Sequence, residues 1–160
     1  MYHRDHRGNF IFSGPVTPAE IFAIADAVAT EGISGRTAIT DPRSILQFLR
    51  TKLVRLDHEE FHVVFLDARH RVVGVEAMFR GSLTGASVYI GEVVKAALKR
   101  NAAAIVIAHN HPSGVPEPSA ADRELTERIR QALNLVEIRL LDHLVIAAEG
   151  HTSFAERGWL

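Results

Sequence analysis

The chain of 160 residues contains no cysteine. This absence excludes disulfide bonds, thiolate nucleophiles and metal sites that depend on cysteine sulfur. A zinc ion in such a chain would have to be held by imidazole nitrogens and carboxylate oxygens, the other ligands that zinc takes in proteins. The sequence has 9 histidines, so their arrangement is the main source of chemical information.

The chain also lacks an excess of basic side chains. It has 18 Lys and Arg residues against 19 Asp and Glu residues, for a formal net charge of −1 and a pI near 6.8. Proteins that bind nucleic acid through its phosphates carry a basic surface or stripe. The arginines between residues 123 and 139 are interleaved with glutamates, which is typical of a solvated helix surface. We therefore expect DNA binding to be weak and non-specific at most.

No apolar run is long enough to span a bilayer, and the first residues, MYHRDHRGNF, contain no signal-peptide core. We therefore expect a cytoplasmic protein. With 47% hydrophobic and 23% charged residues, the composition is globular, and the length suits one compact core. We divide the chain into an N-terminal tail and helix, residues 1–39, and one domain, residues 40–160. The oligomeric state is left open by the sequence.

Two helices are expected before the first strand. Thr17-Pro18-Ala19-Glu20 combines a capping threonine, a proline in the first helical position and a capping-box glutamate, which predicts a helix to about Thr30 that Gly32 ends. The positions expected to face inward are Ile21, Ile24, Ala25 and Val28. Asp41-Pro42 predicts a second helix through about Val54. Its inward positions are Ile45, Leu46, Leu49 and Leu53.

The rest of the chain alternates strands with helices. Two β-rich runs, Glu60 to Leu66 and Val72 to Phe79, flank a polar turn and predict a hairpin. Helices are predicted over residues 89–100, with Asn101 suited to a left-handed end, and from Ser119 to about Asn134. The remaining predicted strands are 102–109, 136–141, 144–148 and 151–154. This mixed order favours an α+β or three-layer α/β fold over a doubly wound sheet.

The most informative stretch reads AAIVIAHNHPSGVPEPSAAD and ends at Asp122. Its β-branched beginning predicts a buried strand that ends at His109. If extended backbone continues through His111, both imidazoles leave the same side of the chain. Three prolines and a glycine make residues 112–118 a loop. Ser119 can then cap a helix whose first turn contains Asp122, where the helix dipole favours a carboxylate.

Two histidines from a strand end and one carboxylate from a helix start make three ligands. A catalytic zinc site has this number when its fourth position is open to water. We therefore predict that His109, His111 and Asp122 bind Zn²⁺. Taken alone, Ser119-x-x-Asp122 is an ordinary capping pattern and His-x-His occurs on solvated loops. The spacing of all three residues together favours the metal site.

A hydrolase also needs a group that takes a proton from the attacking water and passes it to the leaving group. Glu59 and Glu60 precede a predicted core strand, where a side chain is fixed in position and burial can raise a carboxyl pKa. Alternation leaves the choice open, because Glu59 shares phase with Phe61 and Glu60 shares phase with Val64. The plainer explanation for either residue is an exposed glutamate before a strand.

The pattern His109-x-His111-Pro112, six residues, Ser119-x-x-Asp122 resembles the motif of the JAMM, or MPN-plus, zinc metalloproteases. The flanking sequence is more similar still to the RadC family, over about residues 40–158. The matching segments are Glu59-x-Phe61, Phe79-Arg80-Gly81, Ala108 to Gly114, Glu117-Pro118-Ser119, Leu141-Asp142-His143 and Ser153 to Gly158.

The resemblance implies a three-layer, cytidine deaminase-like α/β fold of the JAB/MPN type, with a central mixed sheet flanked by helices. It also implies that the metal is zinc, with His109, His111 and Asp122 as its ligands. Ser119 matches the serine that steadies the tetrahedral intermediate, and Glu59 matches the catalytic glutamate. Longer members of the family carry an N-terminal helix-hairpin-helix region, whereas about forty residues precede the shared part here, which weakens the expectation of DNA binding.

Three functions compete at this stage. The leading hypothesis is a zinc-dependent hydrolase of peptide or isopeptide bonds, with a metal-activated water and Glu59 as the proton shuttle. The alternative is a non-catalytic binding module, for a protein or as a DNA-associated accessory of the RadC type, that retains the metal site. In the third, the zinc is purely structural. The first hypothesis is favoured because it uses every residue of the motif, and it leaves the substrate open.

Overall fold

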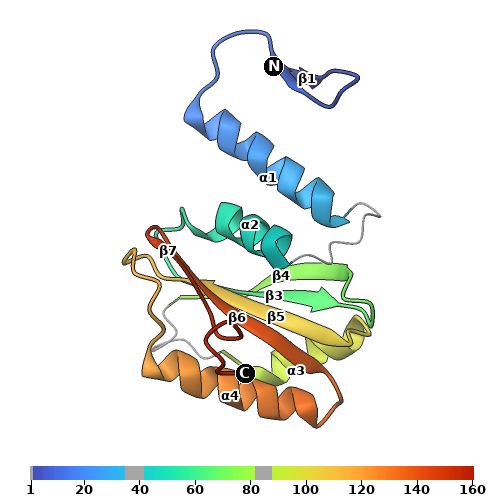
Figure 1. Ribbon diagram of the computed structural model, residues 1–160, viewed down its shortest axis with the longest axis vertical. Coiled ribbons are helices and arrows are strands. Elements are labelled where there is room, and N and C mark those ends of the chain that lie inside the picture. Colours follow the sequence, from blue (N-terminus) through green and yellow to red (C-terminus); the bar gives the residue numbers. More distant parts are fainter. Residues whose placement is uncertain (1, 35–41, 82–87) are drawn as a thin grey trace.

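The structure, a computed structural model, describes residues 2–34, 42–81 and 88–160 (Figure 1). The elements in chain order are β1 (Tyr2–Arg4), β2 (Phe10–Phe12), α1 (Pro18–Ser34), α2 (Pro42–Leu53), β3 (Glu60–Leu66), β4 (Val72–Arg80), α3 (Ile90–Lys99), β5 (Ala104–Asn110), α4 (Ala120–Asn134), β6 (Arg139–Ala147) and β7 (Gly150–Ser153). The N-terminal residues, expected as a tail, form the two-stranded hairpin β1–β2.

The centre of the fold is a five-stranded mixed sheet in the order β4-β3-β5-β6-β7. Strand β3 pairs antiparallel with β4 and β5, β5 pairs parallel with β6, and β6 pairs antiparallel with β7. In this register Phe61 lies opposite His109, and Ile107 lies opposite His143. The start of β3 therefore lies beside the end of β5, where the histidine motif begins.

Helices cover both faces of the sheet, as Figure 1 shows, with α2 on one side and α3 and α4 on the other. The face toward α3 and α4 carries Phe61, Val63 and Ile107, which belong to one buried apolar cluster. The face toward α2 carries Val64 and Val106, which belong to a second cluster. The prediction of a three-layer α/β fold is confirmed, and the alternation of residues along β3 supplies both cores.

The local patterns predicted most of the elements correctly. In α2 the predicted Ile45, Leu49 and Leu53 are buried at helical spacing, whereas Phe48 is buried in place of the predicted Leu46, which is only partly buried. The hairpin β3–β4 forms as expected, and α3 is followed by Asn101 in the left-handed conformation, with a φ of 49°. The expected helix start at Asp41 lies outside the described residues.

Helix α1 differs from its prediction in length and in burial. It continues to Ser34 rather than ending at Gly32, because a glycine inside a helix costs only about 1 kcal/mol. The expected buried stripe is wrong, since Ile21 is 50% exposed and Val28 is 38% exposed. The helix lies beyond α2, outside the three layers, and contacts α2 and β4 only along one side (Figure 1). Within the described residues, no helix combines the length and apolarity needed to cross a membrane.

The last predicted helix and the strands after it differ in one respect. Helix α4 runs from Ala120 to Asn134 as expected, but the two strands predicted on either side of Asp142-His143 are a single strand, β6. Both polar residues stay in the ladder, opposite Val106 and Ile107. We expected the strand to be interrupted at these two residues because they are polar. In the structure they belong to the continuous strand β6.

Candidate metal centre

The two motif histidines lie at the end of β5, on the sheet face that packs against α4. The backbone stays extended past the end of the strand, because the His111 amide donates a hydrogen bond of 2.8 Å to the Ile146 carbonyl of β6. His109 and His111 therefore project from the same side, as predicted, with their Nε2 atoms 3.0 Å apart.

Asp122 reaches the same point from the first turn of α4. Ser119 is the N-cap of this helix, and its Oγ accepts a hydrogen bond of 3.1 Å from the Asp122 amide. The Asp122 Oδ2 accepts bonds of 2.7 Å from both the amide and the hydroxyl of Ser119, which completes a capping box. The carboxylate is thereby aimed at the histidines, with Oδ1 at 3.3 Å from His109 Nε2 and Oδ2 at 3.6 Å from His111 Nε2.

These separations fit one small divalent cation. One ligand atom from each of His109, His111 and Asp122 lies within 4.8 Å of the others. Ligands at the usual zinc distances of about 2.0–2.1 Å and at a tetrahedral angle would be about 3.3 Å apart. The observed spacings of 3.0, 3.3 and 3.6 Å bracket that value. The group could therefore hold a metal ion, and three protein ligands leave a fourth position free.

The far side of each imidazole is also held. His111 Nδ1 lies 3.0 Å from the Val115 carbonyl oxygen, which requires that Nδ1 donate. His109 Nδ1 lies 2.8 Å from Nε2 of His143 on β6, and His143 Nδ1 lies 2.6 Å from the Thr126 hydroxyl on α4. A ring nitrogen that is engaged in this way leaves the other nitrogen available as a metal ligand, which is the usual support for metal-binding histidines.

The electrostatics of the site favour a cation. Burial raises the pKa of the Asp122 carboxyl, but the hydrogen bonds and charge of His109, His111 and Ser119 outweigh it and hold that pKa well below its usual range. The Asp122 carboxylate raises the pKa of the His111 imidazole, against the opposing effect of burial. Burial, together with the nearby His109, lowers the pKa of His143 well below its ordinary value. At neutral pH the carboxylate is therefore ionised and His143 is neutral.

The site is closed on one side and open on the other. His109 has no exposed surface and Asp122 is almost fully buried, whereas the His111 side chain is 15% exposed and Ser119 lies at the surface. A substrate could therefore approach from the side of His111 and Ser119. Water is excluded from the back of the site by the sheet and α4.

The structure separates the two glutamates that the sequence left as alternatives. Glu60 binds two imidazoles, with its Oε1 at 2.9 Å from His58 Nε2 and its Oε2 at 2.9 Å from His62 Nε2. Glu59 shares phase with Phe61, whose side chain belongs to the α3–α4 side of the sheet. Asp122 raises the pKa of the His111 imidazole most, and the charge of Glu59 adds to the same effect.

Asn110, between the two motif histidines, fixes the backbone around Glu59. It is 1% exposed, and its Oδ1 accepts a bond of 2.8 Å from the Glu60 amide while its Nδ2 donates one of 2.8 Å to the His58 carbonyl. The side chain of Asn110 thus binds the residues on both sides of Glu59. A third bond, from the Gly81 amide to the Glu59 carbonyl, extends the β3–β4 pairing to the same place.

Three supporting residues were missed from the sequence, namely Asn110, Thr126 and His143. Thr126 follows Asp122 by one helical turn and is buried, so a polar residue on the inward face of α4 was the available signal. His143 belongs to the segment Leu141-Asp142-His143, which we noted only because it matches the RadC family. The contacts of His143 and Asn110 are distant in sequence, because His143 meets His109 across 34 residues and Asn110 meets Glu60 across 50.

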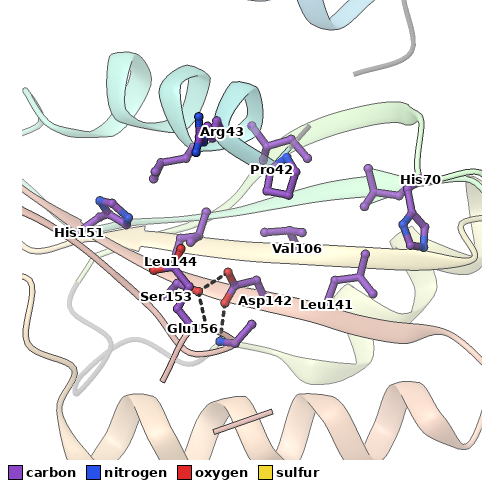
Figure 2. A pocket seen from close by; sticks show the side chains of 14 residues that line it. Pro42, Arg43, His70, Val106, Leu141, Asp142, Leu144, His151, Ser153 and Glu156 are labelled. Carbon is purple, nitrogen blue, oxygen red and sulfur yellow. Dashed lines mark hydrogen bonds between the residues drawn. The ribbon is translucent and has the colours of Figure 1, made fainter. Parts of the chain in front are cut away.

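A separate cavity of about 330 Å³ lies on the α2 face of the sheet, away from the metal centre (Figure 2). Its floor is apolar and includes Val106 and Leu144, and its wall includes Asp142. The Asp142 carboxylate accepts a bond of 2.6 Å from the Ser153 hydroxyl and one of 3.0 Å from the Ala155 amide, drawn as dashed lines in Figure 2. Asp142 therefore holds the turn that follows β7.

A three-layer α/β domain with a His-His-Asp group at the junction of a central strand and a helix defines a JAB/MPN-type metal-site domain. Comparison with known families assigns the chain more narrowly. The family model described as "RadC-like JAB domain" matches residues 39–159. The chain belongs to this family, and the resemblance noted from its motifs is confirmed.

The similar proteins carry a family name without an activity. A UPF0758 protein of Leptothrix cholodnii is 48% identical over 151 residues, which are 92% of this chain and 68% of the relative. A UPF0758 protein of Ectopseudomonas mendocina is 45% identical over 92% of this chain and 67% of its own length. A UPF0758 protein of Vibrio cholerae is 53% identical over 77% of this chain and 55% of its own length. The relatives extend beyond the part that this chain matches.

Proposed function

We propose that this chain is a zinc-dependent hydrolase of peptide or isopeptide bonds that uses a metal-activated water. The observation that carries the proposal is the group of three ligand atoms from His109, His111 and Asp122, all within 4.8 Å, at a site with one open side. Membership in the RadC-like JAB domain family supports the same class of reaction.

His109, His111 and Asp122 are the residues that would hold the ion. Two imidazoles and a carboxylate, without any thiolate, suit Zn²⁺ in a catalytic site. When bound, Zn²⁺ lowers the pKa of a coordinated water toward neutrality and polarises a substrate carbonyl. The remaining chemistry has to come from side chains of this chain that move a proton and stabilise negative charge.

Glu59 is the group that we assign to proton transfer. Its carboxylate takes a proton from the attacking water and delivers it to the leaving nitrogen, which then departs as a neutral amine. Its phase along β3 and its electrostatic effect on His111 support this role. Glu60 suits it less well, because both of its carboxylate oxygens are engaged by histidines.

Ser119 is the group that we assign to the carbonyl oxygen of the substrate. Its hydroxyl lies at the exposed rim of the site and can donate a hydrogen bond as that oxygen becomes negatively charged. The amide groups at the start of α4 add the positive end of the helix dipole at the same place. In the structure this hydroxyl donates to Asp122 Oδ2, so it would turn toward the substrate.

A cleavage assay with two glutamate variants tests the proposal. The zinc-loaded protein is incubated with a peptide library and with isopeptide-linked probes, and cleavage is measured with and without a chelator. Glu59→Gln should fold and bind zinc normally but lose at least about 10²-fold in kcat, the lower range for a general base. Glu60→Gln is the matched control and should retain cleavage.

Two results would count against the assignment. Loss of turnover in Glu60→Gln with normal turnover in Glu59→Gln would move the base by one residue. The absence of any chelator-sensitive cleavage across both substrate classes would instead favour a binding module that keeps the metal site.

A further inference from the structure

Three side chains form a hydrogen-bond network behind the metal centre that ends on the backbone of Asp122. His109 Nδ1 lies 2.8 Å from His143 Nε2, His143 Nδ1 lies 2.6 Å from Thr126 Oγ1, and Thr126 Oγ1 lies 2.5 Å from the Asp122 carbonyl oxygen. The Asp122 carboxylate lies 3.3 Å from His109 Nε2, at the metal position. All four residues are at most 2% exposed. This network joins β5, β6 and α4.

The direction of each hydrogen bond follows from the number of protons available. The Asp122 carbonyl has no proton, so the single Thr126 hydroxyl proton must be donated to it. Thr126 can then only accept from His143, which places the His143 proton on Nδ1. His143 is neutral, because its ring has no exposed surface and no carboxylate partner among its hydrogen bonds. Its Nε2 therefore accepts, and the proton in that bond belongs to His109 Nδ1.

The nitrogen of His109 that faces the metal position is Nε2. A neutral imidazole carries one proton, so a His109 ring that donates from Nδ1 has a free lone pair on Nε2. That nitrogen is the one within 3.3 Å of Asp122 and 3.0 Å of His111. The hydrogen bond to His143 thus keeps the ring proton on Nδ1 and leaves Nε2 facing the metal position, which is the form that a cation requires.

We propose that His143 and Thr126 are positioning residues that lock His109 in its metal-binding tautomer and tie it to the backbone of Asp122. This inference rests on the proposed metal site, and it adds two residues, Thr126 and His143, that are not part of the His-x-His and Ser-x-x-Asp motif. The acceptor of the hydrogen bond from His109 is unusual, since metal-binding histidines donate as a rule to a carboxylate, a carbonyl or a water. Here it is a neutral imidazole, which Thr126 holds in the less common tautomer.

The surroundings of His143 keep its ring in one orientation. The Phe154 ring lies 4.6 Å from it at an interplanar angle of 31°, and the Phe61 ring meets it nearly edge-on at 6.1 Å. Both phenylalanines are 1% exposed. Rotation of His143 or entry of water would be needed to reverse these hydrogen bonds, and this packing opposes both.

Nitrogen NMR of the whole chain, labelled at histidine, tests the tautomers directly. We expect His143 to be singly protonated on Nδ1, and His109 to carry its proton on Nδ1, in the zinc-loaded protein. Detection of His143 with its proton on Nε2, or with both nitrogens protonated, at neutral pH would overturn the proposal. This result does not depend on cleavage, so a protein with these tautomers but no hydrolase activity would count against the proposed function alone.

Threonine variants test the energetic consequence. Thr126→Val keeps the shape but removes the hydroxyl, and it should weaken zinc binding about 10- to 100-fold in a chelator competition, as the loss of such supporting bonds does elsewhere. Thr126→Ser should restore wild-type affinity, which a purely space-filling role for the threonine would not predict. Thr152→Val, at another buried threonine, is the control and should leave the affinity unchanged. Equal affinities for Thr126→Val and Thr152→Val would contradict the proposal, and the serine variant with the NMR experiment decides it if the valine variant does not fold.

Discussion

Single residues decide whether the metal centre is formed, because each proposed ligand comes from a different local structure. His109 is the second-last residue of a buried strand, His111 lies just beyond it, and Asp122 lies in the first turn of a helix. The strand and the helix are both rigid, so the three ligand atoms are held close to one another. An aligned set of this kind leaves little conformational entropy to be lost on metal binding.

Removing one ligand should remove the metal. We expect about one zinc per chain in the wild type, and none after dialysis of His109→Ala or Asp122→Ala, because two protein ligands are too few to hold the ion. Zinc should also raise the Tm of the wild type and of neither variant, with about 2.7 kcal/mol of stabilisation at a free zinc concentration 100-fold above Kd. Elemental analysis and thermal unfolding measure the two effects.

A histidine on the other side of the sheet provides the control for this prediction. His151→Ala, in the wall of the α2-side cavity, should keep wild-type zinc content. Because Asp122→Ala also removes one half of the capping box of α4, at a cost of about 1 kcal/mol, its stability has to be compared in the absence of zinc. Wild-type zinc content in both ligand variants would exclude the assigned site.

The buried Asp142 carboxyl should make the stability of the fold depend on pH. Burial raises the pKa of its carboxyl, and the bonds from Ser153, Ala155 and the His143 amide only partly offset this. A raised folded-state pKa means that the proton stabilises the fold, and that this contribution is lost as the pH rises through the folded-state pKa. Asp142→Asn is neutral at every pH and keeps an acceptor oxygen, so its stability relative to the wild type should increase as the pH rises from about 3.8 to 7.

Asp67 is a control of opposite sign. The backbone and side chain of Arg71 lower the pKa of Asp67 despite some opposing burial. Its contribution to stability is therefore present above the unfolded-state pKa and is lost as the pH falls. Asp67→Asn should lose stability relative to the wild type at pH 7 and regain it in acid. Urea unfolding across this pH range tests both variants, and parallel curves for the two would contradict the sign given for Asp142.

At the scale of elements, periodicity and capping residues predicted the features that are determined by residues close together in the sequence. The spacing of Ile45, Leu49 and Leu53 is visible in the sequence, and so is the capping box of α4. The proximity of His109, His111 and Asp122 could also be anticipated, since a strand end, a short loop and a helix start fix their geometry within twenty residues. Each of these features is local.

The features that could not be predicted depend on packing between distant elements. The apolar side of α1 looked like a core stripe, but the layers of the fold were already complete without it, so Ile21 and Val28 stay exposed. β6 looked like two strands because Asp142 and His143 are polar, although their partners on α4 and in the turn after β7 satisfy them within the sheet. Phase alone could not choose between Glu59 and Glu60 until the two faces of β3 were known.

Glu59 lies where the start of β3 meets the end of β5, and Asn110 holds the backbone on both sides of Glu59. Asn110→Ala would leave the part-buried Glu60 amide and His58 carbonyl without their partner, which should cost about 1–3 kcal/mol in free energy of unfolding. It should also lower kcat while leaving zinc content unchanged, because Glu59, the proposed base, would move and the proposed ligands would not. Urea unfolding, elemental analysis and the cleavage assay measure the three quantities separately.

An exposed asparagine provides the comparison. Asn134→Ala, at the last residue of α4, removes a surface side chain and should change stability by less than about 0.5 kcal/mol. If Asn110→Ala were as stable and as active as Asn134→Ala, the role of Asn110 in holding Glu59 would be wrong.

At the scale of the whole molecule, the charges are balanced and locally paired. Arg130 binds Glu127 through two bonds of 2.8 Å, Arg157 binds Glu117 in the same way, and Arg100 binds Glu76 at 2.6 Å. Such pairs reduce the positive potential that a phosphate backbone would meet. The metal centre opens beside one of them, because Glu117 lies in the loop that precedes Ser119.

This balance predicts weak binding to nucleic acid. Affinity for DNA comes chiefly from lysines and arginines that neutralise phosphates, and this chain has 18 such residues against 19 acidic ones. We expect a Kd of roughly 10⁻⁴ to 10⁻⁶ M for a short duplex of random sequence at physiological salt, and a steep loss of binding as salt is raised. Fluorescence anisotropy over a series of salt concentrations measures both. Binding at nanomolar protein that distinguishes one sequence or one DNA structure from another would contradict the prediction, and it would require a basic surface that the pairing of these arginines argues against.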